Sequence, residues 1–420
     1  MVWIIPSLVA AAVALLYGIL LQRRAVPQLE LVGSSPSQTE ENATFVIGDL
    51  HGDVNCARFW IGKTNLIENF SSLDTSAWRW RDPSSTLIFM GDYIDKGPTS
   101  RQTVELVMTL TEQFPAQVTA LMGNHELELL KDRDEERGYF YFQLPYAVVH
   151  PAEYLNYLDS PPEDTDELVI DSLYNASIEV YSLNLYRFTR IAPTSVSEDS
   201  RLVSITEYVN PKHHRQLVSE RLEDYQKSYL DSYRSDTKLG RWLENRPIAH
   251  LTEDGTLFVH GGISEPVARH IFSGGRAAID ELNRQMKLNA HEKDIIAFLE
   301  TTMLGEAVED LVTYRGNHES CSDLVHKILP QMPGVKRLAV GHTPEELVRV
   351  ECDGSFLALD SLLGRWIRAT GNNYCPPNAT DRQFSINGRY ACEPIEQSCE
   401  GQIVKLLQTG EVVIIETTSG

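Results

Sequence analysis

The feature that most constrains the fold is a series of short apolar runs, each closed by glycine and polar residues. The runs are too short for helices, and continuous apolar runs of this length predict strands that are covered on both faces. The polar clusters at their ends are rich in Asp, Asn and His. The runs with such clusters are Phe45–Ile47, Leu87–Met90, Val118–Met122, Leu257–Val259 and Leu338–Val340.

A helix is expected directly after the second run. Val104, Val107, Met108 and Thr111 recur at helical spacing, and Ser100 stands where an N-cap would. Strand, polar loop and helix make a βα unit. In sheets built from such units, ligands gather beyond the carboxyl ends of the strands.

The five clusters together predict a metal site. Their side chains offer oxygen and imidazole ligands and no thiolate, which suits two divalent ions (Mn, Fe or Zn) with one carboxylate as a bridge. A single buried His is more often a core residue than a ligand. Coincidence is a poor explanation for five clusters at equivalent strand ends. The candidates are Asp49, His51, Asp92, Asn124, His125, His260 and His342.

The ordered motifs GDLHGD (48–53), GDYIDKG (91–97), GNHE (123–126), HGG (260–262) and GH (341–342) resemble those of the calcineurin-like metallophosphoesterases. The resemblance implies an α/β fold, the metallophosphatase β-sandwich, in which two mixed sheets are flanked by helices. It also implies a role for each motif position. Asp49 and His51 would hold the first metal, Asp92 would bridge, Asn124, His260 and His342 would hold the second, and Asp95 would orient His125 as the general acid.

The last motif points to one branch of that superfamily. Pro344 stands where many members have a second His, which resembles the phosphoprotein phosphatases, and Phe356–Asp360 looks most like the Shewanella-like, bacterial-type members. The resemblance implies hydrolysis of phosphomonoesters of phosphoproteins through a hydroxide activated by a dinuclear metal centre. Two alternatives stay open: a dinucleoside polyphosphate hydrolase, and a catalytically weak binding module tethered to a membrane.

We expect Lys96, Arg315 and Asn124 to bind the substrate phosphate. Lys96 departs from the family pattern, which has Arg at this position. A guanidinium grips two oxygens in a fixed fork, whereas an ammonium is a point charge on a flexible stem. Phosphate binding should therefore survive but be weaker or less directional.

A long insertion separates Glu126 from His260 and occupies about residues 127–245. A helix is expected where Leu217, Arg221, Tyr225 and Tyr229 recur every four residues. The insertion is either a lid that selects substrates or a peripheral helical subdomain. The GNHE tetrapeptide also recurs at 316–319, directly after Arg315, which we interpret as coincidence.

The chain carries a net charge of −22, which disfavours nucleic acid as a partner. Residues 1–21 are expected to be a transmembrane signal anchor, or else a signal peptide, with a linker at 22–43 and the catalytic domain at 44–420. Sequons at Asn42, Asn69, Asn175 and Asn378 slightly favour a lumenal or extracellular catalytic domain. The oligomeric state is left open.

Two further predictions concern the cysteines. Cys56 is expected to be a packed free thiol. Cys375, Cys392 and Cys399 fall in a stretch read as a surface loop, with one disulfide if the compartment is oxidising.

Overall fold

The computed structural model describes residues 42–133, 149, 151–158, 227–291, 295–365, 367 and 398–417. The chain divides into two compact units, Met1–Glu40 and Glu41–Gly420, and the described residues belong to the second. No helix among them is both long and apolar enough to cross a bilayer. The anchor predicted at residues 1–21 lies outside the described part, as does nearly all of the predicted linker.

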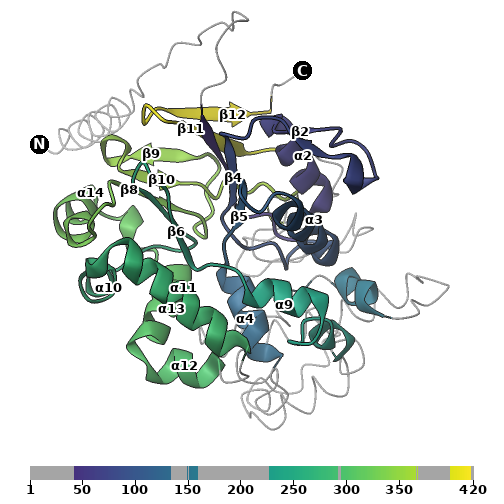
Figure 1. Cartoon of the computed structure of the whole chain (residues 1–420), viewed down its shortest axis with the longest axis horizontal. Helices are drawn as coiled ribbons and strands as arrows, with labels where there is room; N and C mark the ends of the chain where they lie inside the picture. Colours follow the sequence, from purple (N-terminus) through teal and green to yellow (C-terminus); the bar gives the residue numbers. More distant parts are fainter. Residues whose placement is uncertain are drawn as a thin grey trace, which may run out of the picture. The chain divides into compact units, whose positions relative to one another are not determined.

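Two five-stranded sheets form the centre of the described domain (Figure 1). The first has the order β12-β11-β1-β4-β5 and the second β6-β7-β8-β10-β9, and β2 and β3 form a small third sheet. Within the first, β1, β4 and β5 are parallel; within the second, β7, β8 and β10 are parallel. The bounds are β1 Ala43–Ile47, β2 Ile67–Glu68, β3 Arg79–Trp80, β4 Thr86–Phe89, β5 Val118–Ala120, β6 Ala249–Leu251, β7 Thr256–Val259, β8 Arg337–Val340, β9 Arg349–Glu351, β10 Phe356–Ala358, β11 Gln402–Leu407 and β12 Val412–Glu416.

Alternating side chains explain why these runs are apolar throughout. In β1, Val46 belongs to a cluster that includes Phe258 and Leu357 of the second sheet, whereas Phe45 and Ile47 belong to a larger cluster shared with the helices. Successive residues of a strand point to opposite faces. The central strands are therefore covered on both sides, and the mixed α/β sandwich predicted from the motifs is confirmed.

Helices lie beside both sheets (Figure 1), with α2 packed on β1, α3 on β5 and α11 on β6. The α-helices are α2 Val54–Thr64, α3 Ser100–Gln113, α4 Asn124–Asp132, α9 Lys238–Glu244, α10 Glu265–His270, α11 Arg276–His291, α12 Ile295–Thr301, α13 Met303–Thr313 and α14 Cys321–Asp323. The 3₁₀ and π turns are η1 Thr75–Ala77, η2 Pro151–Tyr157, η3 Phe272–Gly274, η4 Gly316–His318, η5 Leu324–Ile328, η6 Leu329–Gln331 and η7 Cys352–Gly354.

The helix expected after Gly97 is confirmed as α3, but its cap differs from the prediction. Thr99 is the N-cap residue and makes no side-chain cap hydrogen bond, and Ser100 is already the first helical residue. The free amides at this end are instead bound by Glu153 from the insertion.

The described parts of the insertion pack on the catalytic domain. Tyr154 and Tyr157 of η2 meet Tyr229 and Tyr233 in a buried aromatic cluster. In α9, the indole of Trp242 donates a hydrogen bond to a residue of α3. Tyr229 lies in a helical turn as expected, while Leu217, Arg221 and Tyr225 lie outside the described residues.

The expectation of a free thiol at Cys56 was wrong. Cys56 in α2 forms a disulfide with Cys399, just before β11, and a second disulfide joins Cys321 to Cys352. One disulfide was expected among Cys375, Cys392 and Cys399, but the structure pairs Cys399 with a residue 343 positions away. The packing of α2 against the first sheet, which short-range sequence pattern does not encode, brings the two cysteines together.

Candidate active site

The described residues include six parallel strands, and each is followed by a polar residue that enters the site. β1 leads to Asp49 and His51, β4 to Asp92, β5 to Asn124, β7 to His260, β8 to His342 and β10 to Asp360. The five clusters predicted from the sequence are thus brought together. The sixth contribution, Asp360, was not among the predicted site residues.

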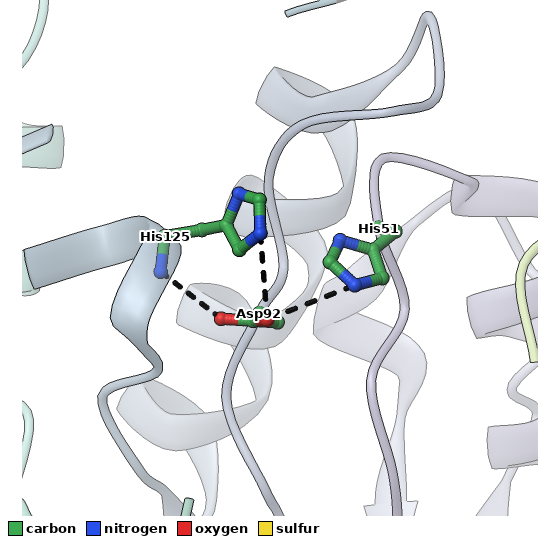
Figure 2. A group of neighbouring side chains, drawn as sticks. All are labelled: His51, Asp92 and His125. Carbon is green, nitrogen blue, oxygen red and sulfur yellow. Dashed lines mark hydrogen bonds and ion pairs between the residues drawn. The ribbon is translucent and has the colours of Figure 1, made fainter. Parts of the chain in front are cut away.

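Asp92 lies at the centre of this arrangement. Figure 2 shows its carboxylate between His51 and His125. Its Oδ2 is 3.7 Å from Nε2 of His51 and 3.8 Å from Nε2 of His125, while its Oδ1 is 3.2 Å from Nε2 of His260. One carboxylate therefore faces both halves of the site, which is the position that a bridging ligand needs.

The first half of the site consists of His51 and Asp49 beside Asp92. Nδ1 of His51 lies 3.2 Å from the carbonyl of Ile94, and a proton donated there leaves Nε2 as the ligand atom. Nε2 in turn lies 4.0 Å from Oδ2 of Asp49. Ligand atoms of His51, Asp92 and His125 all lie within 4.8 Å of one another.

The second half is built around Asn124, the first residue of α4. Its Oδ1 lies 3.0 Å from Nε2 of His260 and 2.8 Å from Nδ1 of His342. Nδ1 of His260 lies 2.9 Å from the Met90 carbonyl, so this imidazole too is oriented by its other nitrogen. Asp92, His260 and His342 form a second group with ligand atoms within 4.8 Å.

The electrostatics of Asp49, His51 and His342 fit bound cations. Burial, together with the carboxylates of Asp360 and Asp92, raises the pKa of Asp49 well above its ordinary value. Burial lowers the pKa of His51 well below its usual range, and burial with His260 and Arg315 lowers that of His342 to about 2. A crowded acid such as Asp49 and neutral imidazoles such as those of His51 and His342 are groups that divalent ions relieve and bind.

His125 and Asp95 form a hydrogen-bonded pair at the rim of the first half. Nδ1 of His125 lies 2.5 Å from Oδ2 of Asp95. Burial acts to lower the pKa of His125, but the carboxylates of Asp92 and Asp95 outweigh it and raise this pKa above its usual value. A protonated His held next to the reacting centre is the form that a general acid requires.

Both cations expected near the phosphate lie at the site, in different settings. Lys96 is 5% exposed, and burial lowers its pKa against the pull of Asp95 and Asp92. Arg315 is exposed, yet its charge contributes to the lowered pKa values of Lys96 and His342. The sequence therefore identified one buried and one exposed cation.

Glu126 is a supporting residue to which sequence reasoning assigned no role. Its fully buried carboxylate accepts backbone N–H bonds from Asp92, Tyr93, Ile94 and Gly123 at 2.8–3.3 Å. Asp92 has a left-handed φ of 52°, which costs about 1–2 kcal/mol for a residue other than glycine. Glu126 holds this strained turn, and its place at the third helical position of GNHE was the available signal.

Two further carboxylates support the same edge. Asp360 is 1% exposed beside Asp49, and one of its oxygens has no hydrogen-bond partner among the described residues. Asp53, the second Asp of GDLHGD, binds the backbone and guanidinium of Arg365 and also accepts the Cys56 amide at 3.2 Å. Only the position of Asp360 after an apolar run could have identified it from the sequence.

Comparison with known proteins shows short, specific similarities. The chain is 37% identical over 81 residues to the serine/threonine-protein phosphatase 6 catalytic subunit of Caenorhabditis elegans, which is 19% of this chain and 20% of that protein. It is 31% identical over 96 residues to serine/threonine-protein phosphatase SIT4 of Candida albicans, 23% of this chain and 27% of the relative. The matches thus span about a fifth to a quarter of these relatives.

Similarity to solved structures extends over more of the chain but is weaker. A cold-active protein-tyrosine phosphatase of a psychrophilic Shewanella species is 16% identical, with a TM-score of 0.48, over 93% of this chain and 86% of that one.

The family model described as calcineurin-like phosphoesterase matches residues 44–346, more than half of the chain. The match begins in β1 and ends just past His342, so it includes the motifs that supply the metal-ligand candidates and His125. This extent agrees with the ordered motifs and with the sandwich fold. The chain therefore belongs to the calcineurin-like phosphoesterases, hydrolases that act on phosphoester bonds.

Proposed function

We propose that this protein is a phosphoprotein phosphatase that hydrolyses phosphomonoesters at a centre of two divalent ions. The observation that carries the proposal is the Asp92 carboxylate, which faces His51 on one side and His260 on the other. The similarity to two proteins named serine/threonine-protein phosphatases supports the substrate class.

Asp49, His51 and Asp92 would hold the first ion, and Asp92, Asn124, His260 and His342 the second. Two bound ions would supply charge neutralisation at the phosphoryl oxygens and a hydroxide at neutral pH. His51 and His260 each face a backbone carbonyl through Nδ1, which directs Nε2 to the ligand position. The absence of thiolate favours Mn, Fe or Zn bound through oxygen and nitrogen.

The protein's own groups would then bind the phosphate and supply the proton. Lys96 and Arg315 provide positive charge for the non-bridging oxygens, in a chain whose net charge is −22. His125, protonated through its contact with Asp95, donates to the leaving oxygen. Asp95 accepts from Nδ1, so Nε2 of His125 is the atom that delivers the proton.

The decisive experiment combines metal analysis with a substrate panel. Purified protein should contain about two divalent ions per chain. It should hydrolyse phosphoserine, phosphothreonine or phosphotyrosine peptides faster than diadenosine tetraphosphate. Faster turnover of diadenosine tetraphosphate would identify a dinucleoside polyphosphate hydrolase instead. Metal binding without turnover of any substrate would support a membrane-tethered binding module.

We also propose that the catalytic domain lies in an oxidising compartment, held there by the predicted anchor. Two disulfides support this, because such bonds persist mainly outside the reducing cytosol. Asn69, in a sequon, is exposed. Asn175 and Asn378 lie outside the described residues.

This location can be tested by electrophoresis. Protein from its native source should migrate differently before and after reduction, and endoglycosidase should shift its mobility. Cys56→Ser with Cys321→Ser should abolish the reduction-dependent difference that these bonds cause. Free thiols at all four positions would place the domain in a reducing compartment.

A further inference from the structure

A short segment of the insertion packs directly on the loop that carries Asp95. This segment, η2, lies at Pro151–Tyr157. Asn156 donates from Nδ2 to the Pro98 carbonyl at 3.0 Å and accepts a 2.6 Å bond from Arg101 on its own carbonyl. The insertion therefore contacts both the loop and the first turn of α3.

Glu153 is the central residue of this contact. It is 1% exposed, and its carboxylate accepts the backbone N–H groups of Ser100 and Arg101, each at 2.8 Å. These are unpaired amides of the first turn of α3, where partial positive charge favours a carboxylate. Nδ2 of Asn156 donates a third bond at 3.0 Å. Since Thr99 makes no side-chain cap bond, Glu153 takes over the capping role from outside the helix.

Ser100 relays this contact to the catalytic pair. Its hydroxyl accepts the backbone N–H of Asp95 at 3.0 Å and lies 3.4 Å from the Gly97 carbonyl. The carboxylate of Asp95 then lies 2.5 Å from Nδ1 of His125. A continuous chain of hydrogen bonds thus leads from Glu153 through Ser100 and Asp95 to His125.

The loop needs such support, because its backbone is strained. Asp95 and Lys96 have left-handed φ values of 70° and 66°, which residues other than glycine rarely adopt. Strained conformations of this kind persist only where the surrounding structure holds them. The last residue of η2, Tyr157, anchors the segment through a 2.9 Å contact between its hydroxyl and that of Tyr233.

We propose that Glu153 is a positioning residue for general-acid catalysis: by capping α3 it fixes Ser100, and through Ser100 the Asp95–His125 pair. The inference rests on the proposed acid role of His125. In this role η2 supports the catalytic loop, which differs from both a lid that selects substrates and a peripheral subdomain.

Three variants of the full-length, metal-loaded protein test this proposal. Glu153→Ala removes both acceptors, and Glu153→Gln keeps one oxygen but turns an amide toward the other N–H. Ser100→Ala breaks the relay while leaving Glu153 in place. Glu105→Gln is the matched control, because Glu105 also bonds Arg101, at 3.0 Å through Nε, but caps nothing.

The readout is kcat/KM on phenyl phosphate, whose leaving group needs a proton, and on 4-nitrophenyl phosphate, whose leaving group does not. We expect Glu153→Ala to lower the phenyl phosphate value about thirtyfold and the nitrophenyl value less than about threefold, within the range of a displaced catalytic group. Glu153→Gln and Ser100→Ala should show the same selectivity with smaller losses. Glu105→Gln should leave both values unchanged.

A double variant adds a readout that a purely structural role would not move. In a His125→Asn background, Glu153→Ala should have no further selective effect, because the two residues act through one path.

The possible outcomes separate this inference from the proposed function. Equal losses on both substrates, or a lower Tm with an unchanged ratio, would overturn the role of Glu153 alone. Absence of leaving-group selectivity in His125→Asn would overturn the acid role and this inference together. If Glu153→Ala does not fold, Ser100→Ala and Glu153→Gln decide the question by the same ratio.

Discussion

The tetrapeptide Gly-Asn-His-Glu occurs twice in this chain, at 123–126 and at 316–319, and the two copies have different surroundings. The first follows β5 and opens the nine-residue helix α4. The second follows Arg315 and forms η4, a single 3₁₀ turn. Identical residues thus enter the structure from a strand end in one case and from a loop in the other.

In the first copy every polar side chain is directed to the site. Asn124 meets His260 and His342, and His125 meets Asp95. Glu126 holds the backbone of the Asp92 turn. This copy places candidate ligand, acid and support within one turn of a helix.

In the second copy Asn317 holds the loop after His260, and His318 contacts Arg349. Asn317 accepts from the Ile263 amide at 2.7 Å and donates to the Ile263 carbonyl at 2.9 Å. Nδ1 of His318 lies 2.7 Å from a guanidinium nitrogen of Arg349. The recurrence that we interpreted as coincidence therefore has a structural use, although it supplies no metal group among the described residues.

The two histidines show what environment does to one residue type. Asp92 and Asp95 raise the pKa of His125 above its usual value against the effect of burial. Burial, with Arg349 and Arg315, lowers that of His318 to about 4. At neutral pH His318 is therefore uncharged and cannot serve as an acid.

The largest expected difference between the copies is at these histidines. His125→Asn should keep both metals and lower kcat on phenyl phosphate about 1,000-fold, with a much smaller loss on nitrophenyl phosphate. His318→Asn should change either value less than about threefold, because it removes contacts to Arg349 and Phe356, which are not candidate site residues. Parallel kinetics with metal analysis check both. Equal losses on the two esters in His125→Asn would remove it from the acid role.

The next largest expected difference is between Glu126 and Glu319, in how much each contributes to the free energy of unfolding. Glu126→Gln turns an amide toward backbone N–H donors that have no other partner among the described residues, which should cost about 3 kcal/mol of unfolding free energy. Glu319 is exposed, so Glu319→Gln should cost less than about 0.5 kcal/mol. Denaturant unfolding of the pair measures the difference. A neutral Glu126→Gln would mean that the Asp92 turn is held by other contacts.

We expect loss of Asn124 to affect metal affinity and loss of Asn317 to affect stability. Asn124→Ala should weaken binding of one ion about tenfold or more, with little change in Tm. Asn317→Ala leaves the N–H and C=O of Ile263 unpaired in a buried loop, which should cost about 2 kcal/mol with metal affinity kept. Metal titration and thermal unfolding of both variants provide the crossed comparison. A drop in metal affinity in Asn317→Ala alone would reverse our assignment of the copies.

The order of the motifs along the chain, and the strand predicted before the first copy, distinguish the two copies in the sequence. Five apolar runs predicted the central strands, and the residues after them predicted where Asp49, Asp92 and His342 would meet, because parallel strands share a carboxyl edge. Local pattern was enough for this, since each side chain follows its own strand by only a few residues.

Contacts between distant parts of the chain were beyond such reasoning. The Cys56–Cys399 disulfide, the cap of Glu153 on α3 and the bonds of Asn317 to Ile263 join segments 343, 53 and 54 residues apart. No periodicity or motif relates these positions. The sequence thus predicted which side chains meet at the strand ends, but not the long-range contacts that hold their loops in place.

The smallest expected difference concerns the cations beside the two copies, Lys96 near His125 and Arg315 just before Gly316. Lys96 is buried, so Lys96→Ala should raise KM for phosphopeptides about tenfold, the effect of losing one charged hydrogen bond in a shielded site. Lys96→Arg should restore or increase activity, because a guanidinium can bind two phosphoryl oxygens.

Arg315 is exposed and its charge is screened, so Arg315→Ala should raise KM only about threefold. Steady-state kinetics at two salt concentrations check this order, since the Arg315 effect should shrink at high salt while the Lys96 effect persists. Unchanged kcat and KM in Lys96→Ala would show that the buried cation stabilises the loop and does not bind phosphate.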